Sequence, residues 1–64
     1  MFIVNNHKSN KTEAVRSATE LRLLINNITG NSYYGDEVYE WALTPICTQY
    51  VHEDFTVALV EKEV

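Results

Sequence analysis

The chain has 64 residues and a mass of 7.4 kDa; 45% of the residues are hydrophobic, 22% are charged, and the formal net charge is −4. This length predicts one domain spanning residues 1–64, and the composition is typical of a folded protein rather than a disordered one. The sequence excludes a large multi-layer enzyme. It also excludes a membrane-spanning helix, because no window approaches about 18 apolar residues.

Cysteine usage and the N-terminal residues bear on the compartment. Cys47 is the only cysteine, which excludes an internal disulfide and is typical of a reducing environment. The apolar run at the N-terminus is too short for a signal peptide and has no basic lead. We therefore expect a cytoplasmic protein. Because a domain of this size buries only about 60% of the surface of its unfolded chain, its stability should be marginal.

The charges are distributed unevenly along the chain. Residues 1–32 carry four Lys/Arg and two Asp/Glu. Residues 33–64 carry one Lys and seven Asp/Glu. Such an asymmetry favours a partner surface over a uniform solvated shell. The alternative is that the acidic residues only keep a small protein soluble.

The first half of the chain predicts a strand followed by a long helix. Phe2-Ile3-Val4 is a short β-prone run, and residues 5–10 are polar and turn-like. Apolar residues then recur at helical spacing on one face: Ala14, Ala18, Leu21, Ile25 and Ile28. Asn10 with Glu13 three residues later is a weak N-terminal cap, and Gly30 supplies a C-terminal stop. These signals predict a helix over residues 11–28.

The second half is read as a loop, a short helix and a hairpin. Residues 30–35 form the expected loop, and residues 36–43 fit a helix that begins at two acidic residues and stops before Pro45. Alternation of Tyr39, Trp41 and Leu43 leaves a strand open as the alternative for this segment. Further alternation predicts strands over residues 46–50 and 55–59, separated by a polar turn at 52–54. Glu61-Lys62-Glu63 should fray.

The expected fold is therefore α+β, in the order β-α-α-β-β. A three-stranded antiparallel sheet should pack on one long amphipathic helix.

The sequence shows no pattern for catalysis, cofactor binding or a metal site. A structural zinc site needs four closely spaced ligands, and the candidates His7, Cys47, His52 and Asp54 lack that spacing. On a continuous strand, Cys47 and His52 would point to opposite faces, so they do not form a nucleophile and base. No glycine-rich phosphate-binding loop is present. We expect no enzyme and no cofactor.

Direct binding of nucleic acid has limited support. Four cations, Lys8, Lys11, Arg16 and Arg22, could meet phosphates from one end of the long helix. Binding of DNA or RNA normally starts from a basic domain, however, and this one is acidic overall. A weak nucleic-acid binder is therefore the least favoured of our hypotheses.

Aromatic and acidic residues gather in the second half. Six of the seven aromatic residues fall between residues 33 and 55. Tyr and Trp often anchor interfaces, and carboxylates around them steer a basic partner. Trp41, Tyr50 and Phe55 are expected in the core instead. The candidate partner-binding residues are Tyr33, Tyr34, Asp36, Glu37, Tyr39, Glu40, Glu53 and Asp54.

In size, acidity and lack of catalytic residues, the chain is similar to the small inhibitors that phages and mobile elements encode. Those proteins, anti-CRISPRs, host-polymerase inhibitors and DNA mimics among them, block nucleic-acid-handling machines by covering a basic surface. This similarity of class favours an acidic protein-binding inhibitor or regulator, with anti-defence as one such role. The alternative is a structural homodimer or a subunit of a larger assembly, motivated by the small core and the apolar helix stripe.

Overall fold

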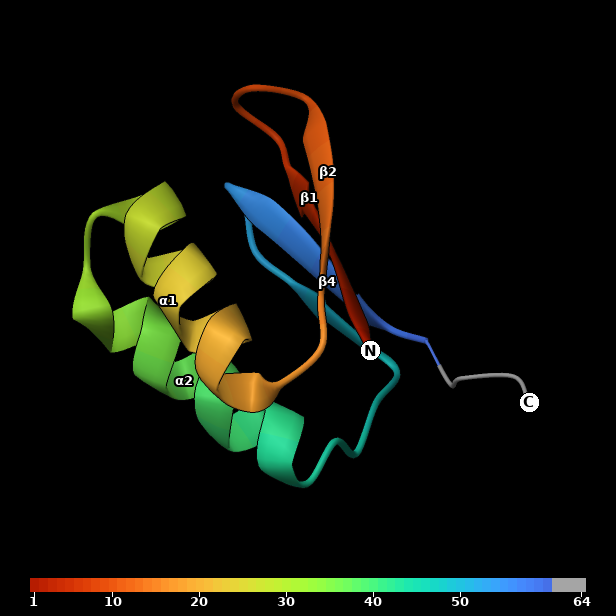
Figure 1. Cartoon of the computed structure of the whole chain (residues 1–64). Helices are drawn as coiled ribbons and strands as arrows, with labels where there is room; N and C mark the ends of the chain where they lie inside the picture. Colours follow the sequence, from red (N-terminus) through yellow and green to blue (C-terminus); the bar gives the residue numbers. More distant parts are fainter. Residues whose placement is uncertain (61–64) are drawn as a thin grey trace.

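The computed structural model describes residues 1–60, which form a four-stranded antiparallel sheet and two helices (Figure 1). The sheet order is β2-β1-β4-β3, so the first and last strands are neighbours in the middle. The elements follow one another as β1 (Phe2–Asn6), β2 (Lys11–Val15), α1 (Ala18–Thr29), α2 (Ser32–Leu43), β3 (Gln49–Val51) and β4 (Phe55–Leu59).

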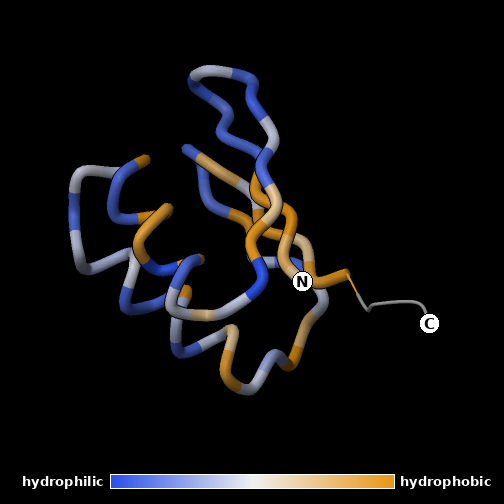
Figure 2. Tube along the Cα trace, viewed as in Figure 1, coloured by the Kyte–Doolittle hydropathy of each residue, from blue (hydrophilic) through white to orange (hydrophobic). Residues whose placement is uncertain are grey.

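Both helices cover one face of the sheet, and the core lies between the two layers (Figure 1). Val4 of β1 and Val57 of β4 are cross-strand partners that point toward the helices, and both are fully buried. Figure 2 shows that hydrophobic segments follow the central strands, whereas the connection between β1 and β2 is hydrophilic. The buried apolar residues are Phe2, Val4, Leu21, Ile25, Val38, Phe55 and Val57.

The α+β class is confirmed, but the expectation of three strands and one long helix is wrong. Residues 11–15, expected to begin the helix, form β2 and pair with β1. The helix begins only at Ala18, because Ser17 caps it: its hydroxyl accepts a hydrogen bond from the Glu20 amide at 3.2 Å. The Glu20 carboxylate in turn accepts from the amide of Arg16, the residue before the N-cap, at 3.0 Å, so Glu20 reaches back across the helix start much as in a capping box. Gly30 ends α1 in the left-handed conformation, as expected.

The second helix is longer than the sequence indicated, and the strand alternative for residues 36–43 is wrong. The side chain of Asn31 accepts from the Tyr33 amide at 2.9 Å, so the helix begins at Ser32 rather than Asp36. Part of the expected 30–35 loop is therefore helical, and Gly35 is buried where α2 crosses α1. A Cβ at Gly35 would overlap the side-chain amide of Asn26, so any larger residue here would force Asn26 to move.

The expected C-terminal hairpin is present, with a shorter first strand. β3 covers only Gln49–Val51, and β4 matches the expected 55–59. Cys47 lies before β3 and is exposed, so it is not the sheet residue we expected. Of the aromatic residues assigned to the core, Phe55 is fully buried, whereas Trp41 and Tyr50 are half-buried against it. The expected fraying at 61–63 falls outside the described residues.

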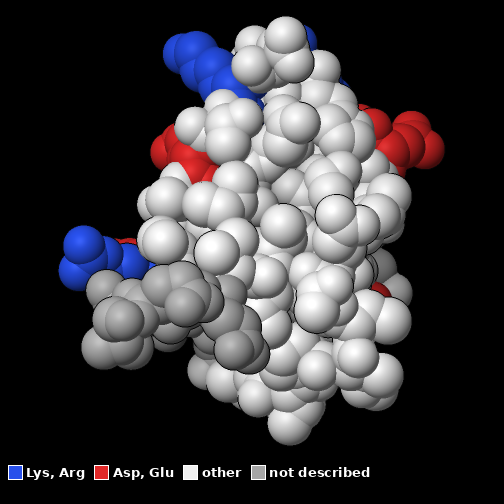
Figure 3. Space-filling model, turned by 90° about the vertical axis from the view of Figure 1, so that its right-hand side faces the viewer, with Lys and Arg blue, Asp and Glu red and all other residues white. Residues whose placement is uncertain are grey.

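The face of the sheet opposite the helices carries no charged residue within residues 1–60. Cross-strand partners share a face of the sheet. The row of side chains that runs across the four strands through Ile3 therefore contains Ala14, Ala58 and Gln49. The neighbouring row contains Thr12, Asn5, Thr56 and Val51. In Figure 3, this open face is almost entirely uncharged and the charges lie at its margins.

Candidate protein-binding surface

The exposed side of α2 carries four of the eight candidate residues. We define the α2 surface as the exposed residues at helical spacing Tyr33, Asp36, Glu37, Glu40 and Leu43. The helix contains no Lys or Arg, and its three carboxylates lie between two exposed apolar side chains, Tyr33 and Leu43. The earlier reading of Asp36 and Glu37 as the helix start is wrong, because they lie beyond its first turn.

Asp36 and Tyr39 face α1 and share one cation. The Arg22 guanidinium lies 3.0 Å from a carboxylate oxygen of Asp36 and 5.5 Å from the centre of the Tyr39 ring. The Asp36 carboxylate is therefore locally compensated, although both partners of this ion pair are solvent-exposed. In contrast, Glu37 and Glu40 form no ion pair within residues 1–60.

The other flank of α2 meets the β3–β4 turn through aromatic rings. The Tyr33 and Tyr34 rings meet edge to face at 5.3 Å, and Tyr34 contacts the His52 ring at 4.6 Å. Burial raises the pKa of Tyr50, and the nearby charge of Glu37 acts in the same direction. Glu37 follows Asp36 directly in α2, so its side chain projects about 100° further around the helix axis.

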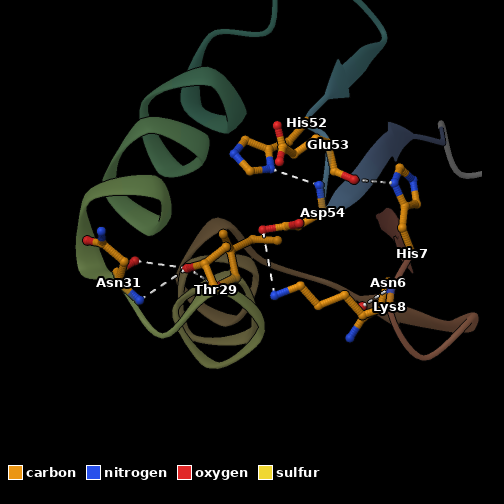
Figure 4. Close-up of polar contacts among 9 residues, drawn as sticks. Asn6, His7, Lys8, Thr29, Asn31, His52, Glu53 and Asp54 are labelled. Carbon is orange, nitrogen blue, oxygen red and sulfur yellow. Dashed lines mark hydrogen bonds and ion pairs between the residues drawn. The ribbon is translucent and has the colours of Figure 1, made fainter.

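The β3–β4 turn is tied to the end of β1 (Figure 4). The His7 ring bonds the Glu53 carbonyl oxygen at 3.0 Å through Nδ1 and the Thr56 hydroxyl at 2.8 Å through Nε2. Lys8 lies 3.8 Å from the Asp54 carboxylate. Within the turn, the Asp54 amide donates to Nδ1 of His52 at 3.0 Å. These contacts fix the position of the β3–β4 turn. The exposed Glu53 carboxylate on this turn forms no ion pair within residues 1–60.

The structure therefore separates the eight candidate residues into different settings. Tyr33, Tyr34 and Glu37 lie together beside the β3–β4 turn that carries Glu53. Asp36 and Tyr39 share Arg22, and Asp54 is half-buried beside Lys8. Glu40 lies on the exposed side of α2, one helical turn beyond Asp36.

Sequence reasoning missed two residues of this region. Leu43 is 55% exposed at the end of α2, and His52 connects Tyr34 to Phe55 through ring contacts of 4.6 and 4.7 Å. Leu43 could have been found from its spacing to Glu40, because both residues lie within the helix predicted over residues 36–43. The role of His52 depends on tertiary contacts, for which the sequence carries no signal.

The expectation that four cations gather at one end of a long helix is wrong. Lys11 lies on β2, Arg16 precedes α1, and only Arg22 is helical. Lys8 and Arg22 are each within an ion pair, with Asp54 and Asp36. The four cations therefore do not form a single helix-borne patch.

Within residues 1–60, no three His, Cys, Asp or Glu side chains gather as a metal site would require. None of the helices in that range has the length and apolar character needed to cross a membrane. In comparisons with known proteins, the chain matches no family model, no curated protein and no solved structure. Function must therefore be argued from the surface itself.

Proposed function

We propose that this protein binds a larger protein that carries a basic, nucleic-acid-handling surface, and that it acts as an inhibitor or regulator by covering that surface. The contact is made by the α2 surface together with Glu53 of the adjoining turn. The supporting observation is that Glu37, Glu40 and Glu53 are exposed and form no ion pair within residues 1–60.

The chemistry of these residues fits occlusion rather than catalysis. Exposed carboxylates attract a cationic surface over a distance and accelerate encounter, and the effect weakens as salt is added. Tyr33, which is 60% exposed, and Leu43 supply apolar area at the two ends of the α2 surface. Aromatic anchors of this kind bury a large rigid area at low entropic cost.

The test compares association of a partner with the wild type and with the double variant E37Q/E40Q. The partner is first captured from a nuclease-treated lysate of the cells that produce the protein, and its association is then followed by surface plasmon resonance. Removing two carboxylates should slow association roughly tenfold at low salt and flatten the salt dependence. Asp36 is left in place because its charge is already compensated by Arg22.

The matched control is S9K/N27K, which changes the net charge by the same amount at two exposed positions outside α2. If the location of the carboxylates matters, this control should retain most of the wild-type association rate. Equal association by the wild type and E37Q/E40Q would refute the proposal. Equal slowing by both double variants would reduce the effect to net charge alone and would also contradict it.

A further inference from the structure

β2 is an edge strand whose free backbone groups can be identified. Backbone bonds from Val60 N–H to the Met1 carbonyl and from His7 N–H to the Asp54 carbonyl, both 2.9 Å, show that the odd-numbered residues of β1 bond toward β4. In antiparallel sheets the direction alternates, so the even-numbered residues of β1 bond toward β2. Their partners in β2 are the odd-numbered residues 11, 13 and 15. Thr12 and Ala14 therefore direct their N–H and C=O groups away from the sheet.

No element within residues 1–60 covers this edge. β2 ends the sheet order, and four of its five residues are exposed. In Figure 1 the turn between β1 and β2 extends beyond both helices, and no strand lies on the outer side of β2. The strand contains no proline, one of the features by which natural edge strands are protected from pairing.

The charges of β2 are complementary to themselves. Lys11 and Glu13 lie on either side of Thr12 and point to the same face, since neighbours two apart share a face. If two copies of β2 pair antiparallel with Thr12 opposite Thr12, each Lys11 stands opposite a Glu13 of the other copy. These are non-hydrogen-bonded pairs, in which opposing side chains are closest. The register shifted to oppose Glu13 with Glu13 places like charges together.

We propose that β2 pairs antiparallel with β2 of a second copy, with Thr12 at the two-fold axis, to form a continuous eight-stranded sheet. The interface is isologous, so it closes at a dimer. The acidic α2 surface adjoins β3, at the opposite edge of the sheet from β2, so pairing through β2 keeps the like-charged surfaces apart. This pairing is independent of the function proposed above and leaves both α2 surfaces accessible.

The test measures mass by sedimentation equilibrium up to about 1 mM protein, because an interface of one strand pair is at the weak end of protein associations. The wild type should approach twice the monomer mass. Both K11E and E13K should weaken dimerisation roughly tenfold, because each replaces two attractive pairs with two repulsive ones. The exchanged variant K11E/E13K restores opposite charges and should recover the wild-type dissociation constant.

T12P provides a second test that leaves the monomer's own ladder intact. Proline is tolerated in edge strands where its nitrogen faces solvent, and here it removes the outward N–H at the two-fold axis. T12P should remain folded by circular dichroism and stay monomeric. A monomeric wild type at every concentration would overturn the proposal. So would a dimer insensitive to K11E, E13K and T12P, or a mass that grows beyond the dimer, which indicates head-to-tail assembly.

Discussion

The crossing of α1 and α2 provides a sharp test of the packing. Substituting Gly35 with Ala places a methyl group onto the Asn26 side-chain amide and 3.0 Å from the Arg22 carbonyl oxygen. Overpacking of this kind costs about 1–3 kcal/mol. The better helix propensity of Ala offsets roughly 1 kcal/mol of that. We therefore expect G35A to lower the free energy of unfolding by up to about 2 kcal/mol, and each kcal/mol lowers Tm by about 4–8 °C in a domain of this size.

Asn26 determines most of this cost, so its removal should relieve it. The Asn26 side-chain oxygen is buried and has no hydrogen-bond partner within residues 1–60. N26A removes that oxygen and improves helix propensity, so the single variant should be neutral or stabilised by up to about 1 kcal/mol. In the N26A background, G35A should cost little, which corresponds to a coupling of up to about 2 kcal/mol between the two sites.

The measurement is urea unfolding followed by far-ultraviolet circular dichroism for the complete cycle of four proteins. The control background is N27A, because Asn27 is the next residue along α1 and is exposed. G35A should retain its full cost in N27A and lose it in N26A. The same cost of G35A in both backgrounds would refute the assignment of the clash to Asn26.

Two further predictions concern a helix cap and a phenol. S17A removes the hydroxyl that accepts a hydrogen bond from the Glu20 amide, and it should lower the free energy of unfolding by about 1 kcal/mol. S17D keeps an acceptor at the N-cap and should retain most of the wild-type stability. Thermal unfolding of the two variants checks this. The raised pKa of Tyr50 means that the unfolded state loses the phenol proton first. The stability contributed by the protonated Tyr50 phenol is fully present below pH 10 and is lost as the pH rises through the pKa of the folded state. Y50F has no phenol proton to lose, so it should reduce this loss of stability in alkaline unfolding curves. An unchanged alkaline limb in Y50F would contradict the second prediction.

The boundary between β2 and α1 shows why the sequence misled us. Asn10/Glu13 and Ser17/Glu20 both have the spacing of a capping box, and Ala14 lies four residues before Ala18, which extends the apolar stripe backward. The structure uses only the second pair, because Asn10 adopts a left-handed conformation and turns the chain into β2. Pairing of β2 with β1 is a tertiary gain that local periodicity does not report.

Gly35 misled the prediction of α2 for a different reason. A glycine following polar residues is typical of a turn, so the expected helix began after it. In the structure, Gly35 lies inside α2, where a Cβ would overlap the Asn26 side chain of α1. The strand at 55–59 and the helix stop at Gly30 depend on local signals, and both were predicted correctly.

The candidate surface was predictable in composition but not in arrangement. The concentration of acidic and aromatic residues after residue 33 is visible in the sequence. The pairing of Asp36 with Arg22 and of Asp54 with Lys8 is not, because both partners come from other elements. Which carboxylates keep an uncompensated charge thus depends on tertiary placement.

The pairing of β1 with β4 has a consequence for the order of folding. Phe2 lies opposite Leu59, so the central ladder of the sheet joins segments separated by almost the whole described chain. Closing so long a loop costs entropy before any central contact forms, and it slows folding relative to local contacts. During synthesis, β1 can form a hairpin with β2, but its other side has no partner until β4 has left the ribosome. The hairpin and the two helices must therefore wait for β4 before the core can close.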